Sequence, residues 1–125
     1  MCRNCLACVL LALACIAPAA TGAESMTFTF NNATEYDVDL KFYSRDRNHH
    51  WPSIGKAYVL TAGSKGKQFK IECEAEERLC FGAWTPRKAV WGAGRKGTRS
   101  CENCCHVCKD GDMLKAVTLR QFISR

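Results

Sequence analysis

The chain has 125 residues, of which 47% are hydrophobic and 24% are charged, and its formal net charge is +6. This length fits a single domain, and the hydrophobic content excludes an intrinsically disordered chain. With nine Gly and three Pro, the composition also excludes a collagen-like or linker-like chain.

Residues 1–23 have the order of regions that is typical of a secretory signal peptide. Arg3 precedes an apolar run over residues 6–17, and Thr21 and Ala23 occupy the −3 and −1 positions for a cleavage before residue 24. The run is shorter than the roughly 20 apolar residues needed to span a bilayer. We therefore expect a removed signal rather than a retained membrane anchor.

Lipidation of Cys15 is the alternative fate of this segment. Ala12-Leu13-Ala14 before that cysteine resembles a bacterial lipobox, although Ala12 replaces the expected branched apolar residue. We expect contact with a membrane only if Cys15 is lipidated. In a eukaryotic pathway, Asn32-Ala33-Thr34 would be an acceptor for N-glycosylation.

Residues 24–125 are expected to form one small β domain with a Cys-rich C-terminal loop. They keep 17 of the 18 basic residues and all 12 acidic ones, a net charge of +5, because Arg3 is the one charged residue before them. They also keep six of the ten cysteines. An even number of cysteines in an exported chain favours disulfides, so we expect a secreted or periplasmic protein.

Alternating apolar residues predict short β-strands along this domain. The clearest case is 36–43, where Tyr36, Val38, Leu40 and Phe42 alternate with mostly polar residues. Further strands are predicted at 26–31, 56–61, 68–73, 79–84 and 89–91, with a last strand or short helix from 117 to about 122. The first two runs, 26–31 and 36–43, are expected to pair as a hairpin. Six or seven short strands predict an all-β fold, a small disulfide-stabilised sandwich or barrel.

The cysteine spacing predicts the disulfides only in part. Cys73 and Cys80 flank an acidic connector between two predicted strands, so we expect them to bond to each other. The four remaining cysteines would then pair as 101–104 with 105–108, or as 101–105 with 104–108. If the first bond does not form, a bond from this cluster to Cys73 or Cys80 would tie the C-terminal loop to the sheet.

Zinc is the alternative interpretation of the Cys cluster. Cys101, Cys104, Cys105 and Cys108 form two adjacent C-x-x-C units, which is a spacing found in zinc sites. Export exposes such thiols to oxidants, so we expect disulfides and no metal or cofactor. A zinc-binding protein that uses these four residues stays open as the alternative.

A basic, aromatic-containing stretch is the candidate binding surface. Between residues 84 and 99 there is no acidic residue, and basic loops with aromatic residues can bind anionic polymers. An exported protein meets polysaccharides and cell-surface components rather than nucleic acid. The candidate ligand-binding residues are Trp84, Arg87, Lys88, Trp91, Arg95, Lys96 and Arg99, joined by His49, His50 and Trp51 from the preceding polar loop.

The sequence holds no recognisable catalytic motif. Ser44, Ser53 and Ser64 lie in predicted loops without the strand–turn–helix context of a nucleophile elbow. We therefore expect a small exported module that binds or has a structural role and is not an enzyme, with an anionic surface polymer as the candidate ligand. The alternatives are the zinc-binding protein and a small cationic secreted effector or toxin.

Overall fold

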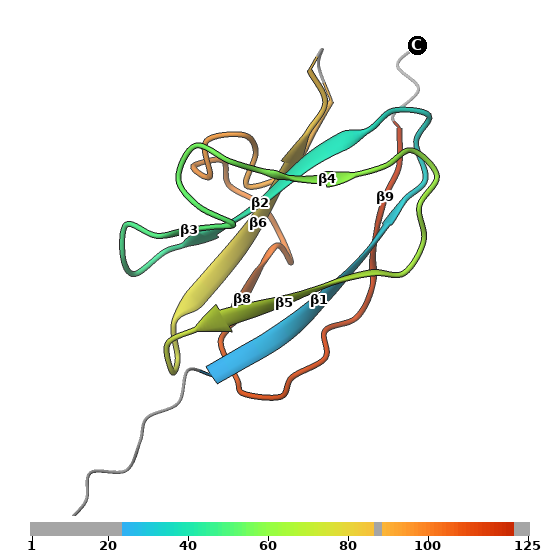
Figure 1. Ribbon diagram of the computed structural model, residues 1–125. Coiled ribbons are helices and arrows are strands. Elements are labelled where there is room, and N and C mark those ends of the chain that lie inside the picture. The colour runs from blue at the N-terminus through green and yellow to red at the C-terminus, as the bar shows by residue number, and fades with distance from the viewer. Residues whose placement is uncertain (1–23, 87–88, 122–125) are drawn as a thin grey trace, which may run out of the picture.

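The computed structural model describes residues 24–86 and 89–121, which form nine strands and no helix (Figure 1). The strands make two sheets, so the predicted all-β, sandwich-like fold is confirmed. The predicted signal peptide, with Cys15, lies outside the described residues. The smaller sheet has the order β5 (Lys67–Cys73), β1 (Glu24–Asn32) and β9 (Val117–Leu119). The larger sheet holds β2 (Val38–Ser44), β3 (His50–Trp51), β4 (Tyr58–Leu60), β6 (Arg78–Trp84), β7 (Val90–Gly92) and β8 (Cys105–Val107).

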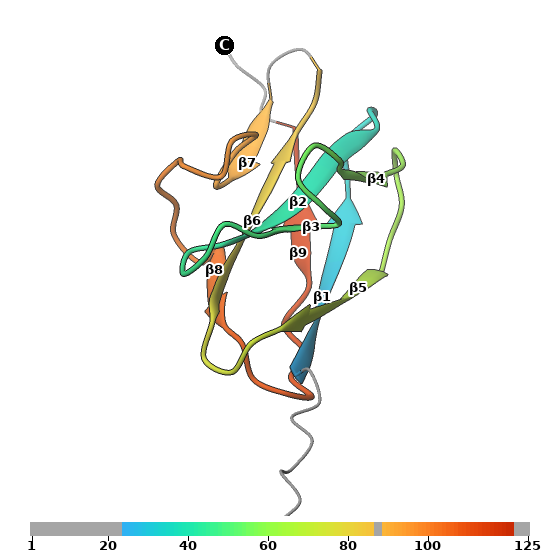
Figure 2. The same cartoon turned by 60° about the vertical axis from the view of Figure 1, so that its left-hand side comes forward.

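In the smaller sheet, β1 is the central strand. It pairs antiparallel with β5, from Glu24 opposite Cys73 to Phe30 opposite Lys67. On its other edge it pairs parallel with β9, where Phe30 lies opposite Val117. The first and last described strands are therefore neighbours, as both views of the ribbon show (Figures 1 and 2).

In the larger sheet, β2 and β6 pair from Asp39 opposite Trp84 to Ser44 opposite Leu79, and the other edge of each strand pairs with two short strands. Both β3 and β4 pair with β2, while both β7 and β8 pair with β6 (Figure 2). Phe81 of β6 binds the chain at two places. Its carbonyl accepts a hydrogen bond from the Ala93 N–H at 2.8 Å, and its N–H donates one to the Cys104 carbonyl at 3.0 Å. Residues 93–104 are thus an excursion from the edge of the sheet.

The predicted hairpin between the first two strands is wrong, since β1 and β2 belong to different sheets. The buried side chain of Asn32 explains the crossing. Its amide nitrogen donates to the carbonyls of Tyr36 at 2.8 Å and Leu60 at 3.0 Å, and its oxygen accepts from the Thr34 hydroxyl at 2.7 Å. These bonds turn the chain towards the larger sheet. They also occupy the amide that N-glycosylation would modify.

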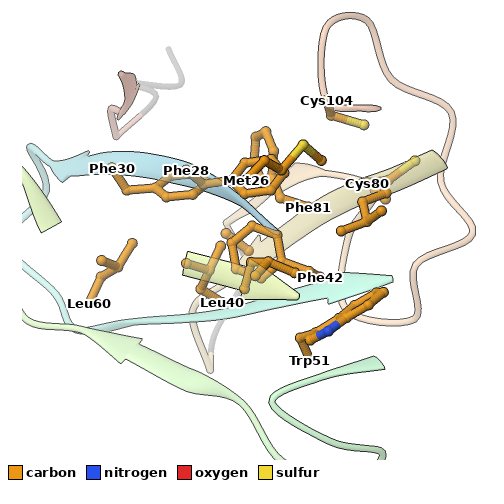
Figure 3. Close-up of a cluster of buried hydrophobic side chains, with 14 of the residues drawn as sticks. Met26, Phe28, Phe30, Leu40, Phe42, Trp51, Leu60, Cys80, Phe81 and Cys104 are labelled. Atoms are coloured by element: carbon orange, nitrogen blue, oxygen red, sulfur yellow. The ribbon is translucent and has the colours of Figure 1, made fainter. Parts of the chain in front are cut away.

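The core lies between the sheets and is rich in phenylalanine (Figure 3). The Phe28 and Phe42 rings lie 4.5 Å apart, and those of Phe30 and Phe81 lie 5.0 Å apart, each pair joining the two sheets. Burying each such side chain stabilises the fold by roughly 1.5–3 kcal/mol. Trp51 lies at the margin of this cluster, and its Nε1 donates to the Glu72 carbonyl of β5 at 2.9 Å.

Three disulfides connect the described residues, and they differ from the first prediction. The bonds are Cys73–Cys108, Cys80–Cys105 and Cys101–Cys104. The predicted Cys73–Cys80 bond is wrong because β5 and β6 lie in different sheets, so the connector between them is no hairpin turn. The alternative prediction, a disulfide from the cluster to Cys73 or Cys80, is confirmed, and both of these cysteines form such a bond. Cys101–Cys104 is the one bond from the predicted cluster pairings that forms.

Candidate functional site

The outer face of the larger sheet carries a covered group of polar and aromatic side chains. In the register of β2 and β6, Asp39 lies opposite Trp84 and Lys41 opposite Gly82, on the side away from the core, and Tyr43 follows them on the same face. A strand in which apolar and polar residues alternate usually exposes its polar face to solvent. Instead, the exposed fractions of Lys41, Tyr43 and Trp84 are 7%, 4% and 8%.

The covering layer is the segment 93–99, which folds back over the sheet. A Cβ at Gly82 would collide with the Gly94 carbonyl oxygen, and a Cβ at Gly97 would lie 2.5 Å from the Tyr43 ring. Two hydrogen bonds hold the segment in place. The Tyr43 hydroxyl donates to the Arg95 carbonyl at 2.5 Å, and Arg45 Nη1 donates to the Gly97 carbonyl at 2.9 Å. The exposed side chains of this segment are therefore presented from a fixed backbone.

Lys41 forms a partly buried polar contact with His50 on this face. Its Nζ lies 3.0 Å from His50 Nδ1 and 5.6 Å from the centroid of the Tyr43 ring. Because an ammonium group has only donors, His50 Nδ1 is the acceptor and the imidazole is neutral, with its proton on Nε2.

The surroundings of these groups shift their pKa values. Burial lowers the pKa of Lys41, and burial together with the charges of Lys41 and His49 lowers the pKa of His50. Burial raises the pKa of Tyr43 to about 12, although the nearby Arg95 charge opposes the rise. At neutral pH, His50 is uncharged and Tyr43 keeps the proton that it donates to the segment above it.

The cations of this face have no carboxylate partners. Within residues 24–86 and 89–121, the ion pairs join Arg47 to Glu77 and Glu74, away from this face. The Arg95 guanidinium lies 5.9 Å from the centroid of the Trp84 ring, which is cation–π distance. We define the cationic face as Lys41, His50, Trp84, Arg95, Lys96 and Arg99.

The structure brings together only some of the residues predicted as binding candidates. His50 packs against Tyr43, and Arg95 lies between Tyr43 and Trp84, with its carbonyl bonded to the Tyr43 hydroxyl and its guanidinium near the Trp84 ring. Lys96 and Arg99 are exposed on the covering segment. Arg87 and Lys88 lie outside the described residues. The rest of the predicted set lies elsewhere.

Trp91 is on the opposite side of the sheet from Trp84. It pairs with Ala83, a core residue, and its Nε1 donates to the Arg120 carbonyl at 3.1 Å. Trp51 is buried in the core, with the exposed His49 ring 4.6 Å away. These three aromatic residues have structural contacts and take no part in the cationic face.

Sequence reasoning missed Lys41, Tyr43 and Arg45. Two features of the sequence could have indicated them. The alternation of β2 puts Lys41 and Tyr43 on one face, and Gly82 within an otherwise bulky strand marks a place where another backbone comes close.

A second cluster is formed by sulfur atoms. The Sγ atoms of Cys80, Cys104 and Cys105 all lie within 4.8 Å of one another, and Figure 3 shows Cys80 and Cys104 at the same end of the core. Cys108 is bonded to Cys73. The four residues predicted for a zinc site therefore do not come together as a set, and Cys80 joins the cluster in place of Cys108.

The fold and these two clusters define a small, disulfide-bonded, sandwich-like β protein with a covered cationic face. No protein-family model matches the chain, and no curated protein or solved structure matches it significantly. In the described part of the chain, no helix is long and apolar enough to cross a membrane.

Proposed function

We propose that the protein is a small exported binding module that recognises an anionic surface polymer, such as a sulfated or carboxylated polysaccharide, through the cationic face. One observation carries the proposal: Lys41 is buried at 7% exposure and has no carboxylate within 4 Å among the described residues. Buried charges in proteins are normally paired. The uncompensated charge of Lys41 therefore adds to the positive potential of the face, which attracts an anionic ligand.

The chemistry of the face favours a polymer over a single small anion. Arg95, Lys96 and Arg99 are exposed within one short segment, next to the buried Lys41. Several cations in a row attract a chain that carries repeated negative charges, and this attraction weakens as salt screens it. The hydrogen bonds of Tyr43 and Arg45 to the segment hold these cations in place, which lowers the entropy cost of binding.

Export is proposed on two grounds. Residues 1–23 have the regions of a signal peptide, and the three disulfides suit an oxidising compartment, either outside the cell or in a periplasm. In this setting the available polyanions are those of cell envelopes and extracellular matrices. We propose binding without catalysis.

The test compares two triple variants on an immobilised sulfated polysaccharide. Arg95→Ala/Lys96→Ala/Arg99→Ala removes three charges from the cationic face. Its affinity should fall about tenfold or more, equivalent to about 1.4 kcal/mol, and it should elute at lower salt than the wild-type protein.

The matched control removes the same charge from the other sheet. Lys65, Lys67 and Lys70 are exposed in β5 and the turn before it, so Lys65→Ala/Lys67→Ala/Lys70→Ala should bind nearly as the wild type does. Lys41→Met, which keeps the length but not the charge, should also weaken binding. Equal losses for both triple variants, or wild-type retention that salt does not change, would exclude the cationic face as the binding site.

A further inference from the structure

We propose that reduction of Cys80–Cys105 and Cys101–Cys104 creates a zinc site whose four ligands are Cys80, Cys101, Cys104 and Cys105. The oxidised and zinc-bound forms would be two states of the same four sulfurs. The proposal does not depend on the function assigned to the cationic face.

Three of the four sulfur atoms already lie close together. Cys104 Sγ and Cys105 Sγ are 3.7 Å apart without a bond between them, and Cys80 Sγ lies within 4.8 Å of both. A zinc ion with Zn–S bonds of about 2.3 Å separates its sulfur ligands by about 3.8 Å. The fourth ligand would be Cys101, which lies outside this group of three and is held next to it by its bond to Cys104 in a C-x-x-C unit.

Backbone hydrogen bonds, rather than the disulfides alone, hold these cysteines near each other. Cys80 of β6 is the register partner of Cys105 in β8. The next residue, Phe81, donates its N–H to the Cys104 carbonyl at 3.0 Å. Opening the two disulfides leaves this pairing intact, so the thiols stay close enough to share one ion.

Arg45 supplies a charge that favours the reduced, metal-bound state. Its Nε donates to Cys80 Sγ at 3.1 Å. A guanidinium next to a sulfur stabilises the thiolate and offsets the negative charge of a four-thiolate zinc centre, as outer partners of metal ligands do. Cys73–Cys108 lies outside the cluster and can remain closed, linking β5 to the segment after β8.

The conversion balances with a dithiol as reductant. Two dithiol molecules supply four electrons and four protons; both S–S bonds break to give four protein thiols, and each dithiol becomes a cyclic disulfide. Zn²⁺ then binds as the four thiols become thiolates and release four protons to solvent.

The experiment maps thiol reactivity in the full chain. The protein is reduced with a phosphine, which does not compete for zinc as a dithiol does. It is then alkylated with and without Zn²⁺, and each cysteine is quantified by peptide mass spectrometry. Zinc should slow alkylation of Cys80, Cys101, Cys104 and Cys105 at least about tenfold, and leave the rates of Cys73 and Cys108 unchanged. Because each cysteine is quantified separately, the alkylation of the cysteines in residues 1–23 is not counted with that of the proposed ligands.

Two double variants sharpen the assignment. Cys101→Ala/Cys104→Ala should lose the protection of Cys80 and Cys105, whereas Cys73→Ala/Cys108→Ala should keep the protection of all four ligands. Zinc-independent alkylation, uniform reactivity of an unfolded chain, or zinc protection of Cys73 and Cys108 would each overturn the proposal.

Discussion

At the scale of single residues, the ion pair between Arg47 and Glu77 is the more deeply buried of the two ion pairs described. The Glu77 side chain is 2% exposed, and its two oxygens accept from Arg47 Nε at 2.5 Å and Nη2 at 3.1 Å. The Glu74 N–H adds a third hydrogen bond at 2.9 Å. The pair fastens the loop between β2 and β3 to the turn between β5 and β6.

The charge state of Glu77 is set by opposing effects. Burial would raise the pKa of its carboxyl, but hydrogen bonds from Arg47, the Glu74 backbone and Ser44, and the Arg47 charge, together lower this pKa from 4.5 to about 2. A group whose pKa is depressed by folding stabilises the folded state above its unfolded pKa. This contribution is therefore complete above about pH 4.5 and disappears as the pH falls towards 2.

The Glu77→Gln variant should reveal this pH dependence. At pH 7 we expect it to lower the free energy of unfolding by roughly 2 kcal/mol, less than for a fully buried pair, because the Arg47 side chain is 35% exposed and can be rehydrated. Below pH 4.5 the difference between variant and wild type should shrink, since the wild-type carboxyl also becomes neutral. Urea unfolding at a series of pH values measures both.

Glu74→Gln is the matched control for that series. Glu74 contacts the same arginine at 3.4 Å, but its side chain is 69% exposed. Exposed pairs contribute little, so its substitution should change stability by less than about 0.5 kcal/mol at every pH. A Glu77→Gln difference that stays constant from pH 7 to pH 3 would contradict the role given to the charged carboxylate.

At the scale of elements, hydrophobic alternation located the longer strands but not their partners. The pattern at 68–73 predicts β5 almost to the residue, because Ile71 and Cys73 face the core and Glu72 between them faces solvent. Pairing depends on contacts made by the connections. The buried Asn32 amide sends β2 to the other sheet, and a polar residue in a turn-like sequence does not indicate this.

The short strands β3 and β8 are below the length at which alternation can be recognised. His50–Trp51 and Cys105–Val107 are strands because β2 and β6 offer a free edge, not because of their own composition. Trp91 shows a related difficulty. The hydrogen bond from the Thr85 N–H to the Ala89 carbonyl sets the register of β6 and β7, and a shift by one residue would move Trp91 to the face of Trp84.

The candidate site was predictable to the extent that it lies in a continuous stretch of sequence. Arg95, Lys96 and Arg99 stand out as unopposed charges in the sequence, whereas the burial of Lys41 is evident only in the folded chain. The approach of the segment 93–99 to the sheet depends on Gly97, which lies against Tyr43 with a φ of 73°.

The Gly97→Ala variant should loosen this covering segment. Its Cβ would meet the Tyr43 ring at 2.5 Å, and the residue would also be held at positive φ. Gly63 has the same φ of 73° with open space around it, so Gly63→Ala isolates the backbone cost, about 1 kcal/mol. We expect Gly97→Ala to cost about 2 kcal/mol more because of overpacking.

Chemical unfolding of the two glycine variants gives the comparison directly. Gly97→Ala should also reduce binding to the sulfated polysaccharide, because Arg95 is carried on the displaced backbone, while Gly63→Ala should leave binding unchanged. Equal losses of stability in both variants would mean that the segment yields to the added methyl group without strain.

At the scale of the whole molecule, the disulfides close chain loops of very different length. Cys73–Cys108 spans 35 residues and joins the end of β5 in one sheet to the segment after β8 in the other. Cys80–Cys105 spans 25 residues within the larger sheet, and Cys101–Cys104 spans three. A disulfide stabilises a fold mainly by restricting the unfolded chain, and it does so more when the loop is longer.

Removing each disulfide as a pair of alanines should therefore rank the variants by loop length. Loop-closure entropy predicts losses of about 4 kcal/mol for Cys73–Cys108, about 3.5 kcal/mol for Cys80–Cys105 and about 2 kcal/mol for Cys101–Cys104. The free energy of unfolding of each double variant, with the other two bonds verified by mass, tests this order. Cys101–Cys104 lies in an excursion whose ends are already pinned at Phe81 by backbone hydrogen bonds. If its loss cost as much as that of Cys73–Cys108, the excursion would be an integral part of the cooperative core, and opening it by reduction would unfold the sheet edge instead of freeing four thiols.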